Sequence, residues 1–173
     1  RQGGVGAAVR RDEASRQRAE QLASLRADVS ETRVVGDVIR HARTMDQATA
    51  VLTILDVLAS SSLSTTVTLT AGRGRGKSAA LGLCLAAAIA HGYSNMFVTS
   101  PSPDNVRTLF EFVLKGLDAL GYEEVADWDL QRGTGEWKDT VVRINVFRGH
   151  RQTIQYIQPQ DHACLLYTSD AAD

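Results

Sequence analysis

Apolar side chains recur at every third or fourth position in three segments of this chain. They cover residues 44–59, 76–91 and 104–120, and this spacing predicts three helices, each with a buried face. Thr44 and Gln47 have the residue types and the spacing of a capping box, so the first helix is expected to begin there. A glycine follows each of the other two segments and marks the end of its helix.

β-branched and aromatic residues concentrate in four shorter runs, which predict strands at residues 65–70, 95–99, 140–147 and 152–157. After the second run, Ser-Pro-Ser-Pro breaks the chain, and Ser102 takes the position of an N-cap. The polar stretch 122–139 has no clear period. Strands and helices that alternate in this order are typical of an α/β fold with a doubly wound parallel sheet.

The first part of the chain has a different character. Residues 10–28 are rich in Arg, Glu, Gln and Ala, which favours a solvated or partner-packed helix over a nucleic-acid-binding arm. A connector follows this helix. We therefore divide the chain into a helical and connector segment of an upstream region, residues 1–43, and an α/β domain, residues 44–162.

Both ends of the sequence suggest a fragment. It opens without Met, and residues 163–173 share no pattern with what precedes them and resemble a translated adapter. We expect 163–173 to be a non-native tail and exclude it from the fold.

Composition removes several classes of function. Lys and Arg number 19 against 20 Asp and Glu, so any contact with nucleic acid must come from a local patch. Two cysteines far apart, Cys84 and Cys164, suggest neither a zinc site nor a disulfide framework. The apolar run 81–90 is too short to span a bilayer, so no membrane partner is expected.

The segment after the first predicted strand carries the most specific chemistry. Residues 71–78 read Ala-Gly-Arg-Gly-Arg-Gly-Lys-Ser. A glycine-rich turn between a strand and a helix, ending in Gly-Lys-Ser, is the pattern of a P-loop that holds the phosphates of a nucleoside triphosphate. The helix N-terminus adds partial positive charge. The motif predicts a nucleoside triphosphate with Mg²⁺, without distinguishing ATP from GTP, and an incomplete, helicase-like doubly wound parallel sheet of the P-loop NTPase type.

Individual roles follow from the chemistry of this motif. Lys77 is expected to reach the β- and γ-phosphates and the Ser78 hydroxyl to ligate Mg²⁺, which makes them the candidate catalytic residues. Ala79 keeps the first helical turn narrow beside the α-phosphate. Arg73 and Arg75 have two interpretations, contact with phosphate or nucleic acid and exposure to solvent. The simplest alternative is a glycine-rich turn that binds nothing.

Other features stay open between two interpretations. Gln47 could hydrogen-bond an adenine edge instead of capping its helix. The loop 99–104 could contact a nucleic-acid backbone while it caps the next helix. No apolar run that ends in Asp-Glu follows Lys77. We expect that acidic strand to lie outside the fragment, which should then bind nucleotide weakly without turning it over.

Three stretches carry a family resemblance. They are Gly-Arg-Gly-Lys-Ser-Ala-Ala-Leu-Gly-Leu at 74–83, Gly-Tyr-Ser-Asn-Met-Phe-Val-Thr-Ser-Pro-Ser-Pro-Asp-Asn at 92–105, and His-Arg-Gln-Thr-Ile-Gln-Tyr-Ile at 150–157. Together they resemble the helicase-like module of the RNA cytidine acetyltransferases, in its eukaryotic branch. The resemblance runs from about residue 22 to residue 161. It places the family's nucleotide contacts on Gly74, Arg75, Gly76, Lys77, Ser78 and Ala79.

The resemblance implies an enzyme of the nucleus and nucleolus that forms N4-acetylcytidine in 18S rRNA and tRNA. It would use acetyl-CoA, at a site absent from this chain, and hydrolyse ATP or GTP. A tRNA adaptor protein and ribosome-assembly factors are the implied partners. Two alternatives remain: a P-loop helicase or NTPase of another nucleic-acid pathway, and a nucleotide-independent RNA-binding assembly module.

Overall fold

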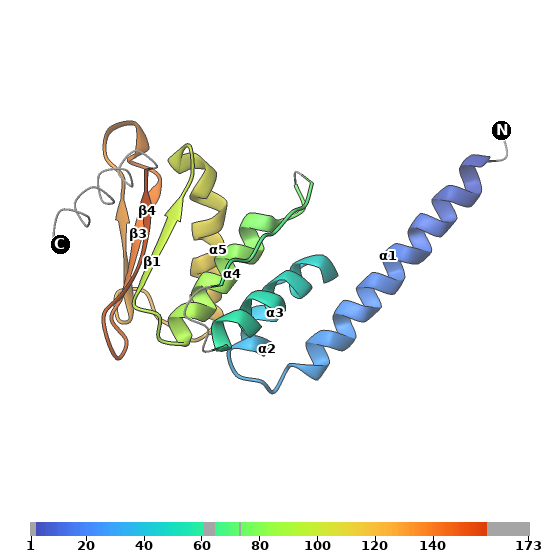
Figure 1. Cartoon of the computed structure of the whole chain (residues 1–173), viewed down its shortest axis with the longest axis horizontal. Helices are drawn as coiled ribbons and strands as arrows, with labels where there is room; N and C mark the ends of the chain where they lie inside the picture. Colours follow the sequence, from blue (N-terminus) through green and yellow to red (C-terminus); the bar gives the residue numbers. More distant parts are fainter. Residues whose placement is uncertain (1–2, 61–64, 73, 159–173) are drawn as a thin grey trace.

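The computed structural model of this chain describes residues 3–60, 65–72 and 74–158 and combines a four-stranded sheet with helices (Figure 1). The predicted tail, 163–173, lies outside the described residues. The helices and strands, in chain order, are α1 (Gly3–Asp28), α2 (Val35–Ile39), α3 (Met45–Ala59), α4 (Lys77–Ala90), β1 (Asn95–Thr99), η1 (Pro103–Val106), α5 (Arg107–Ala119), β2 (Trp128–Arg132), η2 (Gly135–Trp137), β3 (Val141–Val146) and β4 (Gln152–Ile157).

The sheet is mixed, which corrects the prediction of a parallel one. The strand order is β1-β4-β3-β2, and only β1 and β4 run parallel. β3 pairs antiparallel with both β2 and β4. The loop 147–151 is short enough for a hairpin, which forces its two strands to run in opposite directions. A parallel pair needs a longer crossover, and the chain from β1 to β4 supplies one that includes α5.

The helices α4 and α5 lie on one face of the sheet and on each other (Figure 1). Their contact is close because glycines face it: a Cβ on Gly82 would lie 2.4 Å from the carbonyl oxygen of Leu109, and one on Gly116 would lie 2.5 Å from the Cβ of Ala86. The main core fills the space between these helices and the sheet. Its largest members include Ile89, Phe110, Val113, Leu117, Trp128, Ile144 and Ile154.

A second core joins the upstream helices to the other side of α4. Leu22 of α1, Val38 and Ile39 of α2 and Val51 of α3 are buried there. α1 contributes to this core near its C-terminal end and otherwise extends away from the rest of the chain (Figure 1). Cys84 of α4 also belongs to this core, and burial raises the pKa of its thiol to about 12. The upstream segment thus packs directly on the helix that follows the glycine-rich turn.

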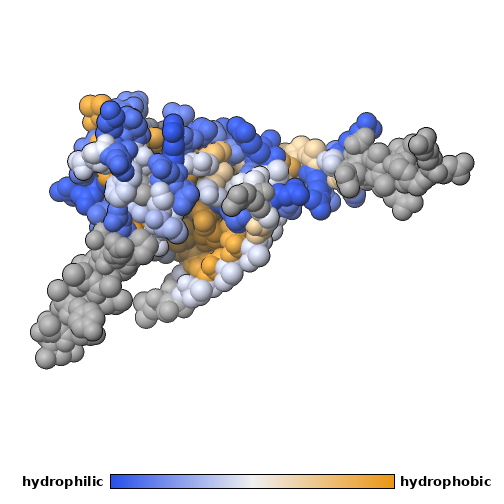
Figure 2. Space-filling model, turned by 90° about the horizontal axis from the view of Figure 1, so that it is seen from above, coloured by the Kyte–Doolittle hydropathy of each residue, from blue (hydrophilic) through white to orange (hydrophobic). Residues whose placement is uncertain are grey.

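The strand predicted at 65–70 is wrong in this structure. The segment is not part of the sheet that the described residues form, and most of its residues are exposed. In Figure 2 it forms a pale arm in front of an orange, hydrophobic hollow. Part of that hollow is a cavity of about 360 Å³ lined by apolar side chains of α3, α4 and β1. β-branched residues favour extended backbone, but a strand also requires a neighbouring strand to accept its hydrogen bonds.

One strand was missed. β2 lies in the polar stretch 122–139, where no alternation of apolar residues marks it. Its pairing with β3 and the burial of Trp128 hold it in the sheet, and Asn145 donates a hydrogen bond to Asp129 across the two strands at 2.5 Å. Tertiary pairing therefore outweighs its weak local propensity.

The other local predictions are confirmed. Helices α3 and α4 end within a residue of their predicted limits, and β1 and β4 match theirs. Ser102 accepts a hydrogen bond from the Asp104 backbone N–H, although it caps the short η1, with α5 following from Arg107. No helix in the described part of the chain is long and apolar enough to cross a membrane.

Candidate functional site

The glycine-rich turn reverses the chain immediately before α4. Gly74 and Gly76 both adopt left-handed backbone conformations, with φ of +77° and +79°. Glycine enters this region without steric cost, whereas other residues are strained there. Gly76 is also the N-cap of α4. The sequence thus places glycine at the two described positions where the reversal requires it.

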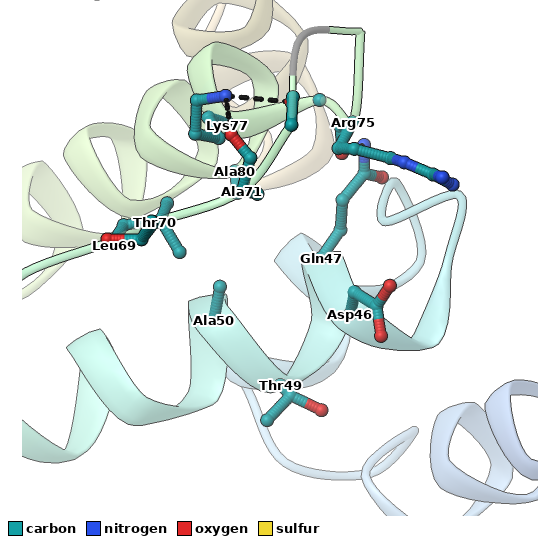
Figure 3. A pocket seen from close by; sticks show the side chains of 12 residues that line it. Asp46, Gln47, Thr49, Ala50, Leu69, Thr70, Ala71, Arg75, Lys77 and Ala80 are labelled. Atoms are coloured by element: carbon teal, nitrogen blue, oxygen red, sulfur yellow. Dashed lines mark hydrogen bonds between the residues drawn. The ribbon is translucent and has the colours of Figure 1, made fainter.

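Lys77 turns its side chain back over the loop (Figure 3). Its Nζ donates hydrogen bonds to the carbonyl oxygens of Ala71 at 2.6 Å and Gly72 at 2.9 Å. An ammonium has three N–H donors, so these two bonds leave one for another acceptor. The charge is therefore held at the loop and not inside an apolar core.

The first turn of α4 has backbone donors without an acceptor inside the helix. The first intrahelical hydrogen bond runs from the Ala80 N–H to the Gly76 carbonyl oxygen at 3.0 Å. The N–H groups of Lys77, Ser78 and Ala79 therefore have no acceptor within the helix. No acidic side chain lies in the first turn to offset its partial positive charge. This end of α4 favours an anion.

Ser78 and Ala79 differ in what they can offer. Ser78 is half-buried on the first turn of α4, so its hydroxyl is placed at the same helix end as the predicted phosphate site. The side chain of Ala79 is buried, which leaves its backbone N–H as the group that could contact a ligand. Arg73 lies outside the described residues.

The loop and helix α3 enclose a cavity of about 450 Å³. Its lining comes from the arm, the turn, the start of α4 and the first turns of α3: Asp46, Gln47, Thr49, Ala50, Leu69, Thr70, Ala71, Gly72, Arg75, Gly76, Lys77 and Ala80. The sequence predicted the contribution of the turn. It did not predict that α3 forms the opposite wall, because no local pattern says which helix packs beside the loop.

Gln47 links this wall to the loop. Its Oε1 accepts a hydrogen bond from the Arg43 backbone N–H at 2.8 Å, and its Nε2 donates to the Arg75 carbonyl oxygen at 3.5 Å. Thr44 caps α3 by accepting from the Gln47 N–H at 3.2 Å, as predicted. The Gln47 side chain, however, reaches the N–H of the residue before the cap.

Arg75 lines the cavity, but its side chain points away from Lys77 (Figure 3). Asp46 is the one carboxylate lining the cavity among the described residues.

The residues present fit a triphosphate better than a metal held by the protein alone. No group of three or more His, Cys, Asp or Glu side chains that could hold a metal occurs in the described ranges. Ser78 supplies one hydroxyl, so Mg²⁺ would arrive with phosphate and water oxygens as its other ligands. Gly76 at the end of the loop, the Lys77 ammonium and the N-terminus of α4 all favour the binding of phosphate groups.

Comparisons with known protein sequences found similar proteins. Residues 68–171 match the family model described as "RNA cytidine acetyltransferase NAT10/TcmA, helicase domain". The chain is 58% identical over 142 residues to the RNA cytidine acetyltransferase of Caenorhabditis elegans, covering 82% of this chain and 14% of the relative. The RNA cytidine acetyltransferase of Homo sapiens is 52% identical over 142 residues, which cover 82% of this chain and 14% of the relative.

The Saccharomyces cerevisiae relative carries the same name. It is 48% identical over 146 residues, which cover 84% of this chain and 14% of the relative. The chain therefore spans about a seventh of the length of the curated relatives that it matches.

Proposed function

This chain belongs to the RNA cytidine acetyltransferase family, whose helicase domain its residues 68–171 match, and on that premise we propose that it is the ATP-binding part of an RNA cytidine N4-acetyltransferase. The whole enzyme would act on 18S rRNA and tRNA in the nucleolus, with a tRNA adaptor protein and ribosome-assembly factors as partners. The acetyl-CoA site would belong to the portion of the longer relatives that this chain does not span.

The observation that carries this proposal is the position of the Lys77 ammonium. It is held by two neutral carbonyl groups of the loop, beside a helix end that has no acidic side chain in its first turn. A phosphate oxygen carries a negative charge and forms a stronger, charge-assisted hydrogen bond than a carbonyl does. An incoming triphosphate would thus compete well for Lys77 and meet the backbone N–H groups of α4.

The proposal assigns each residue of the loop a role in binding the nucleotide. Gly74, Arg75 and Gly76 shape the backbone around the phosphates, and Ser78 and Ala79 present N–H groups from α4. The Ser78 hydroxyl would contribute one ligand to Mg²⁺, which when bound offsets the charge on the β- and γ-phosphates. The Lys77 ammonium would neutralise part of the same charge.

ATP turnover has a physical purpose in RNA acetylation. A cytidine that is paired and stacked in folded RNA is inaccessible to an acetyl donor. Unpairing and unstacking one base costs about a few kcal/mol. A nucleotide-driven change in the helicase domain could supply that energy and expose the base.

Calorimetric titration of the 173-residue chain with Mg-ATP tests the nucleotide site. We expect weak, saturable binding that falls at least about tenfold in Lys77→Ala, because a charge-assisted contact contributes roughly 1.5–3 kcal/mol. Lys138→Ala is the matched control, since that lysine is exposed and lies outside the cavity. Equal affinity of the original chain and Lys77→Ala, or no binding by either, would favour the nucleotide-independent RNA-binding module.

A further inference from the structure

A second cleft adjoins the nucleotide cavity. It has a volume of about 440 Å³ and lies between the C-terminal half of α1 and the start of α3. Its lining is Ser15, Arg18, Ala19, Leu22, Arg26, Arg43, Thr44, Met45, Asp46 and Arg75. Asp46 and Arg75 line both cavities, so the two sites share a wall.

The lining of this cleft is strongly basic. Four arginines, Arg18, Arg26, Arg43 and Arg75, face a single carboxylate, that of Asp46. The formal net charge of the whole chain is −1, so this excess is local. Arg18 approaches Asp46 only to 4.0 Å, and both side chains are mostly exposed. Such a pair contributes little to stability and leaves most of the positive charge available.

Arg26 is held at the cleft while one of its donors stays unsatisfied. Its Nη2 donates to the carbonyl oxygen of Ala42 at 2.5 Å, which fixes the guanidinium at the cleft. Its Nε is shielded from solvent and has no hydrogen-bond partner among the described residues. Leaving a shielded donor of a charged group unpaired is costly, so an acceptor that reached this guanidinium would relieve that cost.

The cleft is also firmly built. Leu22 is 6% exposed and packs into the second core, so the α1 wall is anchored to α2 and α3. The other side is the capped start of α3, where Thr44 is held by Gln47. Arginines from the helix, the connector and the loop therefore converge on one place.

We propose that this cleft binds the phosphodiester backbone of single-stranded RNA beside the nucleotide. Planar guanidinium groups match phosphate oxygens in pairs, and several along one cleft suit successive phosphates. The relatives named RNA cytidine acetyltransferase make RNA the polyanion to test first. The site does not require nucleotide binding, but the shared Arg75 places its phosphates next to the ATP site.

Fluorescence anisotropy with a short, labelled single-stranded oligoribonucleotide tests the proposal over a series of KCl concentrations. The double variant Arg18→Gln/Arg43→Gln removes two exposed charges without touching Lys77 or Arg26. We expect its RNA affinity to fall about tenfold or more. The slope of log affinity against log salt should flatten by about 1.4, since each lost phosphate contact on a single strand accounts for about 0.7.

Arg107→Gln/Arg132→Gln is the charge-matched control. Arg107 pairs with Glu111 on α5 and Arg132 donates to the Asp139 carbonyl, both away from the cleft. An equal loss of affinity or slope in this control would overturn the proposal, as would tighter binding of polyglutamate than of RNA. Mg-ATP titration of the Arg18/Arg43 variant keeps the two proposals separate. Retained ATP binding with lost RNA binding in this variant supports the RNA site, and unchanged RNA binding by the variant would overturn it. RNA binding by the original chain without ATP binding would remove only the nucleotide site.

Discussion

The side-chain nitrogen of Gln47 lies 1.7 Å from the position that a Cβ atom would take on Gly76. The amide of α3 thus occupies the space left by the missing side chain at the N-cap of α4. Gly76 is required twice, once for its backbone angle and once for this contact. Two helices that are distant in the sequence are joined through it at the predicted phosphate site.

Gly76→Ala should therefore destabilise the chain more than Gly74→Ala. Both residues have positive φ, which costs an alanine about 1–2 kcal/mol. No atom of the described residues lies within 4 Å of a Cβ at Gly74, so only the cost of the backbone angle applies there. At Gly76 the displaced Gln47 hydrogen bonds should add about 1 kcal/mol. Urea denaturation of both variants measures the difference. Introducing Gln47→Ala should abolish the difference, and its persistence would show that Gln47 is not the cause.

Gln47→Ala on its own separates two interpretations of this residue. If Gln47 holds the loop through Arg75 and the chain before α3 through Arg43, the variant should weaken Mg-ATP and Mg-GTP binding alike. It should also cost about 1 kcal/mol of stability, because the side-chain hydrogen bonds of Gln47 are lost. If Gln47 contacts an adenine edge, only the affinity for ATP should fall. Parallel titrations with the two nucleotides decide between them.

Lys77→Ala in the full-length enzyme should abolish nucleotide hydrolysis and sharply lower RNA acetylation. The reason is that the proposed ammonium contact to the β- and γ-phosphates would be gone. The first measurement is the rate of nucleotide hydrolysis. The second is mass spectrometry of N4-acetylcytidine in purified rRNA and tRNA. Normal acetylation by a variant without hydrolysis would refute the coupling between the two reactions.

Cys84 should make stability depend on pH in the alkaline range. Burial raises the pKa of its thiol from 9.0 to about 12. Between these values the folded chain keeps a proton that the unfolded chain has lost, so stability is full below pH 9 and falls as pH rises towards 12. Cys84→Ala, compared in a Cys164→Ser background, should show a shallower decline. Identical alkaline profiles for the two chains would contradict the burial effect.

Gly82→Ala should loosen the contact between α4 and α5. Alanine gains about 1 kcal/mol of helix propensity over glycine. Its Cβ, however, would lie 2.4 Å from the Leu109 carbonyl oxygen and 2.8 Å from the Phe112 Cβ, and backbone atoms cannot easily move away. Overpacking of this kind costs about 1–3 kcal/mol, so we expect a net loss of stability. Thermal unfolding measures it, and a raised midpoint would contradict the close helix contact.

Local sequence accounts for the helices, their caps and the glycine-rich turn. Helical periodicity defines α3, α4 and α5, and Thr44 and Ser102 accept the cap hydrogen bonds that their residue types predict. Positive φ at Gly74 and Gly76 follows from the motif itself. These features depend on contacts within a few residues along the chain, where residue type and spacing suffice to predict them.

Tertiary structure decided the rest, because pairing and packing depend on groups that are far apart in the sequence. The polar β2 is a strand since β3 pairs with it, whereas the β-branched segment 65–70 does not join the sheet that the described residues form and stays mostly exposed. The approach of Gln47 to Gly76 and the convergence of Arg18, Arg43 and Arg75 exist only once α1 and α3 pack beside the loop. Periodicity within one helix carries no information about which distant residue fills the space in front of it.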